Sequence, residues 1–149
     1  GKAVNQLREA GYRAALDGAG LAIDPRLILP GDGTTESGRQ ATEHMFVRDV
    51  LPTAFFCVND ATALGVIISL NARKYDLPRE FSVMGFDDIS FASFVTPSLT
   101  TMKQPRLKIG EEAMDLLLAF LEGKPPRKKE VLLRAELIVR NSVSRAGRD

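Results

Sequence analysis

Two pairs of polar residues that directly follow apolar stretches could bind a polar small molecule. Asn59-Asp60 follows the apolar run 53–58, and Asp87-Asp88 follows the run 82–86. A carboxylate accepts hydrogen bonds from hydroxyl groups, and a side-chain amide both donates and accepts them. The structural alternative is that these residues cap the following helix. Capping is favoured for Asp60, which directly precedes a helix, whereas both roles stay open for Asn59 and Asp87.

Arg8 is a third polar candidate, on the first predicted helix. It lies among Asn5, Gln6 and Glu9, where an exposed arginine is the ordinary interpretation. Its planar guanidinium would suit a ligand with hydroxyl or carboxylate groups if this part of the helix faced a cleft.

Residues that could support catalysis or bind a metal are poorly represented. His44 is the only histidine and lies in a polar helical stretch, while Cys57 is the only cysteine and lies in an apolar strand, where a thiol is inert. The His/Cys spacing of a metal site is absent. The glycine-rich run 31–38 lacks the pattern of a phosphate-binding loop or a dinucleotide site, which favours a turn followed by a helix cap. The sequence therefore predicts no enzyme, no cofactor and no metal.

Composition indicates a soluble globular protein. The chain has 149 residues, of which 44% are hydrophobic and 26% charged, enough for one domain with a substantial core. No apolar run has the length of a membrane span, and no signal peptide is visible, so the predicted location is the cytoplasm, away from the membrane. The net charge of +1 gives no electrostatic case for nucleic-acid binding by this segment. The basic residues between 124 and 134 are interpreted as a solvated turn.

Helical and strand patterns alternate along the chain. Helices are predicted at 3–18, from Thr34 or Thr35 towards Pro52, after Asn59, and at 104–122; strands are predicted at 26–29, 53–58, 82–86 and 131–139. The run 53–58 is apolar except for Thr53, which is typical of a strand buried on both faces. This alternation predicts an α/β fold with a doubly wound, mostly parallel sheet flanked by helices. Asn59 and Asp87 would then meet at the carboxyl edge of the sheet, where ligands bind in such folds.

Three colinear stretches resemble the lactose repressor/galactose repressor (LacI/GalR) family. They are 53–60 with Ala63 and Gly65, then Leu77-Pro78 with 82–88, then 97–101 with Gln104-Pro105 and Gly110. Weaker agreement occurs at 8–12, at 31–32 with 37–38, and at 137–140. The resemblance therefore covers nearly the whole chain.

The resemblance implies a transcription regulator, usually a repressor. Members of this family have an N-terminal helix-turn-helix, a hinge helix and a core of the periplasmic-binding-protein-like type I fold. Two α/β subdomains close over a small effector, often a sugar or a purine, and closure changes operator affinity. The alternative is a periplasmic sugar-binding protein of the same fold. The Gly-Phe-Asp-Asp pattern at 85–88 and the Leu-Thr-Thr pattern at 99–101 with Gln104-Pro105 favour the repressor.

Family site positions carry over residue by residue. The resemblance implies effector contacts from Arg8, Asn59 and Asp87. Gly33 occupies the position at which the family often has an aromatic residue that stacks on the effector, so the stacking contact is missing. The resemblance also implies a homodimer whose interface includes four apolar residues: Leu64, Phe91, Phe94 and Val95.

The resemblance divides the chain into three parts and implies that it is incomplete. Residues 1–100 form the C-terminal effector-binding subdomain without its first strand, 101–130 are a crossover segment and helix of the N-terminal subdomain, and 131–149 are a return strand and tail. The apolar stripe of helix 104–122 is then expected to pack on a sheet outside this sequence. Operator DNA would be bound only through the absent helix-turn-helix.

Overall fold

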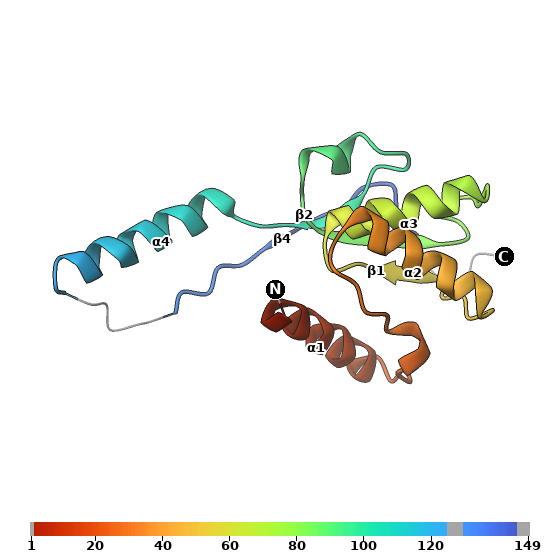
Figure 1. Ribbon diagram of the computed structural model, residues 1–149, viewed down its shortest axis with the longest axis horizontal. Helices are drawn as coiled ribbons and strands as arrows, with labels where there is room; N and C mark the ends of the chain where they lie inside the picture. The colour runs from red at the N-terminus through yellow and green to blue at the C-terminus, as the bar shows by residue number, and fades with distance from the viewer. Residues whose placement is uncertain (1, 125–129, 146–149) are drawn as a thin grey trace.

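A mostly parallel sheet forms the centre of the molecule (Figure 1). The computed structural model describes residues 2–124 and 130–145, and in this part of the chain four strands pair in the order β1-β2-β3-β4. The strands are β1 (Ala54–Phe56), β2 (Ser82–Asp87), β3 (Thr100–Lys103) and β4 (Glu136–Ile138). The first three are parallel, and β4 runs antiparallel to β3. The predicted fold class, a mostly parallel sheet flanked by helices, is confirmed, but no strand was predicted at 100–103, which forms β3.

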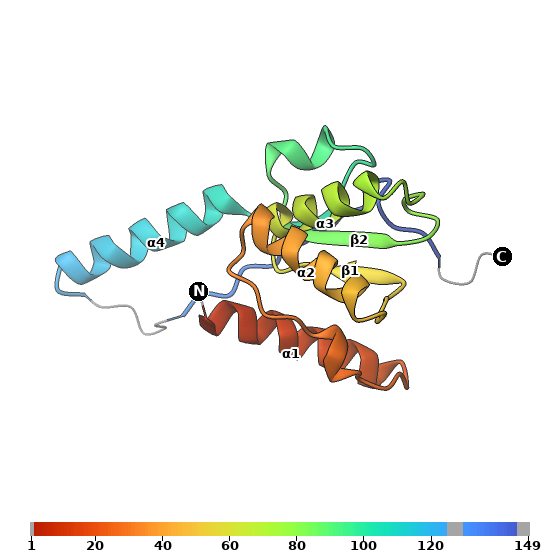
Figure 2. The ribbon, with the colours of Figure 1, turned by 45° about the vertical axis from the view of Figure 1, so that its right-hand side comes forward.

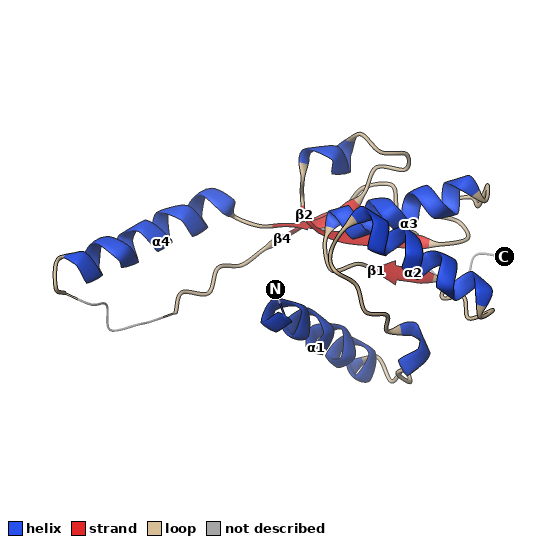
Figure 3. Cartoon of the chain, viewed as in Figure 1, coloured by secondary structure: helices blue, strands red, loops and turns tan. Residues whose placement is uncertain are grey.

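The main helices are α1 (Lys2–Gly18), α2 (Thr35–Val47), α3 (Asp60–Ala72) and α4 (Arg106–Leu121) (Figure 3). Local capping sets the start of two of them. The hydroxyl of Thr34 accepts a hydrogen bond from the backbone N–H of Ser37, and the side-chain oxygen of Asn59 accepts one from Thr62. Each contact satisfies an N–H group that has no partner within its own helix.

Helices α2 and α3 pack so closely that their backbones touch. A Cβ atom on Gly38 would lie 2.1 Å from the carbonyl oxygen of Thr62, and one on Gly65 would lie 2.0 Å from that of Thr35. Only glycine fits at these two positions, so α2 packs directly on α3, which in turn covers the sheet.

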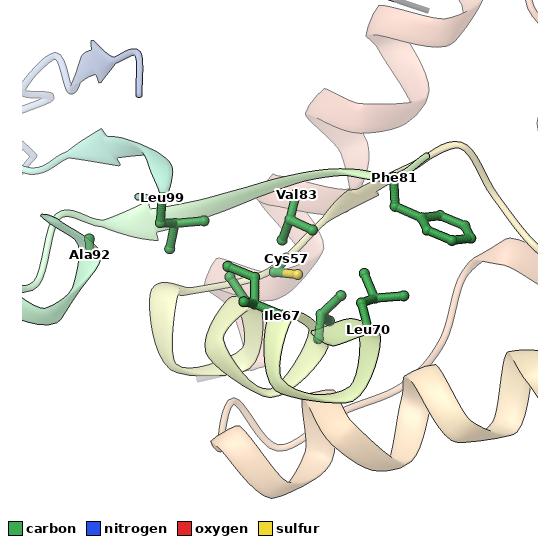
Figure 4. Packing of buried hydrophobic residues seen from close by; sticks show 9 residues of the cluster. Cys57, Ile67, Leu70, Phe81, Val83, Ala92 and Leu99 are labelled. Carbon is green, nitrogen blue, oxygen red and sulfur yellow. The ribbon is translucent and has the colours of Figure 1, made fainter. Parts of the chain in front are cut away.

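The hydrophobic core lies between α3 and the sheet (Figure 4). Leu70, Val83 and Leu99 are completely buried there. Cys57 belongs to the same cluster, and its burial raises the pKa of the thiol to about 12, with a smaller contribution from the nearby Asp60 carboxylate. The thiol therefore stays protonated at neutral pH, which agrees with the inert cysteine predicted from the sequence.

The strand predicted at 26–29 is wrong. Pro25–Leu27 forms a short 3-10 helix capped by the Asp24 carboxylate, and Ile28 and Leu29 belong to no strand. A slot of about 740 Å³ separates residues 27–31 from β1, so this segment has no neighbouring strand with which to pair.

The prediction that 53–58 is buried on both faces is also wrong. The regular strand β1 covers only Ala54–Phe56, and Ala54 and Phe56 are exposed because they line the same slot. Helix α1 runs along this side of the sheet, where the ring of Tyr12 stacks on Phe56 at a centroid distance of 6.5 Å. The face of β1 that carries Ala54 and Phe56 is therefore not closely packed, although its sequence is apolar.

Helix α4 projects away from the sheet in both ribbon views (Figures 1 and 2). None of its residues is buried, and Leu107 and Leu121 are 79% and 75% exposed. Across residues 2–124 and 130–145, no helix combines the length and apolar character needed to span a membrane.

Candidate functional site

Arg8 of α1 and the end of β2 come together at the carboxyl edge of the sheet. The guanidinium carbon of Arg8 lies 3.9 Å from the centroid of the Phe86 ring, a cation–π contact. Its Nη2 lies 3.9 Å from Oδ1 of Asp87, and its Nη1 donates a hydrogen bond to the carbonyl of Val58. Two of the residues predicted from the sequence, Arg8 and Asp87, are therefore neighbours.

A cleft of about 290 Å³ opens beside this pair. Arg8 and Gln104 supply its polar side chains, and Val4, Leu7 and Ile109 are among its apolar ones. Asp87 does not itself line the cleft, but it contacts both polar lining residues: Nε2 of Gln104 donates to its Oδ1, and Nη2 of Arg8 lies 3.9 Å from the same oxygen. A few convergent polar groups in an apolar cleft are typical of small-molecule sites.

The direction of the Asp87 side chain depends on an unusual turn. Asp87 has φ of 121° and Asp88 has φ of 51°, so two consecutive non-glycine residues have positive φ. Each such residue costs about 1–3 kcal/mol, which the surrounding contacts must offset. Asp88 is held by Arg140, whose Nη2 lies 2.7 Å from its Oδ1.

Asn59 and Gly33 form a separate pair. The amide nitrogen of Asn59 donates to the carbonyl of Gly33 at 2.8 Å, while its amide oxygen caps α3. Gly33 has φ of 84°, and a Cβ atom there would lie 3.1 Å from the Asn59 nitrogen. Neither residue lines the cleft beside Arg8. Asn59 therefore fixes the Gly33 turn to the start of α3.

The capping role predicted for Asp60 is wrong. Asn59 is the cap, and Asp60 is the first residue of α3, with a fully buried side chain. Its Oδ2 accepts a hydrogen bond from the N–H of Ile89 at 2.9 Å, and its Oδ1 accepts one from the hydroxyl of Thr101. Gly85 leaves the space for this carboxylate, since a Cβ atom there would lie 2.2 Å from Oδ1. Asp60 thus anchors the loop that follows β2.

Sequence reasoning assigned no role to Phe86, Gln104 or Arg140. Phe86 ends an apolar strand and resembles a core residue, and Arg140 lies in a weakly matching stretch far along the chain. Gln104 belongs to one of the stretches on which the family resemblance rests. That resemblance was the only indication that Gln104 has a role.

The residues predicted for a dimer interface differ in exposure. Phe91 and Phe94 are 66% and 80% exposed, whereas Leu64 is half-buried. Val95 is also half-buried and packs against the core cluster. Ile68, one turn along α3 from Leu64, is 53% exposed and was not singled out from the sequence.

A mostly parallel sheet with an apolar cleft that carries a few polar groups at its carboxyl edge is typical of ligand-binding α/β domains. The chain belongs to the periplasmic binding protein-like domain family, whose model matches residues 1–143. Its similarity to named regulators narrows the class further.

Two relatives are named as transcriptional repressors. The repressor PurR of Vibrio campbellii is 35% identical over 97% of this chain and 43% of its own length. The repressor CytR of Escherichia coli K12 is 39% identical over 91% of this chain and 40% of its own length. The chain therefore spans less than half the length of these relatives. They are repressors rather than enzymes, as the sequence predicted.

Two solved structures lead to the same family. A LacI-type transcription regulator from Bifidobacterium animalis subsp. lactis has a TM-score of 0.88 and 32% identity, covering 95% of this chain and 51% of its own. A LacI family regulator from Enterococcus faecium with bound ribose has a TM-score of 0.82 and 28% identity, covering 92% and 51%. The resemblance to the LacI family is confirmed.

Proposed function

We propose that this chain is the effector-binding part of a LacI-family transcriptional repressor and that its effector is a sugar or a similar polar metabolite. The observation that carries the proposal is the cluster of Arg8, Asp87 and Gln104 at the carboxyl edge of the sheet. The repressor names of the relatives favour this over a periplasmic sugar-binding protein.

The geometry of the cluster suits hydroxyl groups. The 3.9 Å between Arg8 Nη2 and Asp87 Oδ1 is longer than a hydrogen bond, so both groups retain capacity for a ligand. The carboxylate would accept from a hydroxyl and the guanidinium would donate to one.

A sugar fits the available surfaces better than a purine does. A flat base is usually held by stacking on an aromatic ring, but Gly33 provides no ring and one face of Phe86 is already covered by the Arg8 guanidinium. Hydrogen bonding to hydroxyls does not need such a ring.

Asp87→Ala is expected to weaken effector binding by about 1–3 kcal/mol, because a ligand hydroxyl would be desolvated without an acceptor. A thermal-shift screen with D-ribose, other sugars, sugar phosphates and purines selects the ligand, and calorimetry then compares the variants. Asp17→Ala, which removes an exposed carboxylate near the end of α1, is the matched control. Equal affinity of the Asp87→Ala variant and the unchanged protein would show that Asp87 does not bind the effector.

We further propose that the chain cooperates with parts of a longer regulator. The exposed apolar side chains of α4 would pack on a second α/β subdomain, to which 101–130 belong, and 131–149 would return the chain to the first. The slot beside β1 would hold the first strand of the 1–100 subdomain. Operator DNA would be bound by a helix-turn-helix outside these residues. The chain's coverage of 40–43% of its relatives' length supports this division.

The proposed regulator is a homodimer that uses the apolar surface of Ile68, Phe91 and Phe94, with Leu64 and Val95 beside it. Phe94→Asp is expected to raise the dimer dissociation constant at least about tenfold, since a charge would replace an interface aromatic. Light scattering over a concentration series measures the change. Val47→Asp alters a side chain that is 85% exposed on α2 and serves as the control. A Phe94→Asp protein that dimerises as tightly as the control would place the interface elsewhere.

A further inference from the structure

The turn after β2 needs contacts from elsewhere in the chain to keep its shape. Asp87 and Asp88 have φ of 121° and 51°, a conformation that residues with a Cβ atom rarely adopt. Such a turn persists only where neighbouring groups hold it. The side chain of Asp87 leaves the strand at this turn, so its direction depends on the same contacts.

Three groups contact Asp88. Nη2 of Arg140 lies 2.7 Å from its carboxylate, and Nη2 of Arg106 lies 2.7 Å from its carbonyl oxygen. The backbone N–H of Asp88 donates a longer hydrogen bond, of 3.5 Å, to the hydroxyl oxygen of Thr101. The side chains of Arg140 and Asp88 are only 19% and 15% exposed, so their ion pair is largely shielded from water. A shielded, charge-assisted hydrogen bond is the strongest of these contacts.

Arg140 is itself held by the sheet. Its Nη1 donates to the carbonyl of Leu99 at 2.8 Å, and its backbone N–H donates to the hydroxyl of Thr100 at 2.9 Å. The guanidinium therefore bridges the start of β3 and the turn after β2. Lysine has a single ammonium group and cannot reproduce this planar two-point contact.

We infer that Arg140 is a positioning residue for the effector site: its contact with Asp88 holds the left-handed turn that directs the Asp87 carboxylate towards Gln104 and Arg8. The inference rests on the proposed function of that site. Arg140 lies two residues beyond the end of β4, on the segment that returns from α4. A displacement of this segment would therefore change the direction of the Asp87 side chain through the Arg140–Asp88 ion pair, although Arg140 itself does not contact the effector.

The hydrogen bond between Gln104 and Asp87 provides a readout that needs no effector. The NMR chemical shifts of the Gln104 side-chain amide protons depend on whether Nε2 donates to the Asp87 carboxylate. In Arg140→Gln these chemical shifts are expected to match those of the Asp87→Ala variant, in which the hydrogen bond is absent. The backbone amide chemical shifts of the core residues are expected to stay unchanged. Arg73→Gln breaks the ion pair with Glu43, between α2 and α3, and controls for the general loss of an arginine pair. An unmoved Gln104 amide in Arg140→Gln overturns the inference.

A second substitution separates positioning from a purely structural role. Glycine adopts positive φ without strain, so Asp88→Gly removes the strain at position 88, though not that at Asp87, and reduces the need for the Arg140 contact. The double variant Arg140→Gln/Asp88→Gly is expected to return the Gln104 resonances towards their original positions. If they remain displaced, Arg140 only stabilises the fold and the inference fails. Arg140→Lys keeps the charge, so its Gln104 chemical shifts are expected to lie between those of the unchanged protein and those of Arg140→Gln. This variant supplies the test if Arg140→Gln does not fold. The result is independent of whether the cleft binds a sugar.

Discussion

Gly65→Ala is expected to remove about 3 kcal/mol or more of the free energy of unfolding, because a methyl group would be forced into a close backbone contact. The new Cβ atom would lie 2.0 Å from the carbonyl oxygen of Thr35 and 2.7 Å from the backbone nitrogen of Arg39. Backbone atoms cannot rotate aside as a side chain can, so α2 and α3 would have to separate. That movement would loosen the core beneath α3. Urea unfolding followed by circular dichroism measures the loss.

Gly110→Ala is the matched control, since Gly110 lies within α4 and nothing would come within 4 Å of an added Cβ atom. Alanine has the higher helix propensity, so this variant is expected to gain about 0.5–1 kcal/mol. Opposite signs for the two substitutions would establish the close contact of α2 and α3. Equal effects would contradict it.

Elements with strong local signals could be predicted from the sequence. Thr34 caps α2 as expected, and the apolar run 82–86 forms β2 in the middle of a parallel sheet. The segment 26–29 has the composition of a strand, but a strand also needs a neighbour with which to share backbone hydrogen bonds. In the structure a slot lies between this segment and β1, where a neighbouring strand would have to be. The local sequence pattern cannot show whether such a neighbour is present.

The candidate site could be predicted only in part, for the same reason. Asp87 follows an apolar strand, and Arg8 matches the family, so both were named from the sequence. Asp60 was misassigned because a carboxylate between a strand and a helix looks like a cap. Its actual partners, Ile89 and Thr101, lie 29 and 41 residues further along the chain. Only the fold brings such distant residues together.

Asp60→Ala is expected to cost about 3 kcal/mol of the free energy of unfolding, because two donors would lose their acceptor in a buried site. The N–H of Ile89 and the hydroxyl of Thr101 both donate to this carboxylate, whose residue is completely inaccessible to solvent. In the intact protein this position is closed to solvent. The removed side chain would also leave a cavity against Gly85.

Asp60→Asn distinguishes the hydrogen bonds from simple filling of space. Asparagine has nearly the same shape, its amide oxygen can still accept from Ile89, and the Thr101 hydroxyl can turn to accept from the new amide group. This variant is therefore expected to lose about 1–2 kcal/mol, less than Asp60→Ala, because only the charge-assisted character of the bonds is lost. Asp17→Ala, at an exposed site, should change stability by no more than about 0.5 kcal/mol. Urea unfolding of the three variants measures these differences. If Asp60→Ala proved as mild as Asp17→Ala, the buried carboxylate would not anchor the loop after β2, and the turn that directs Asp87 would have to be held by the contacts of Asp88 alone.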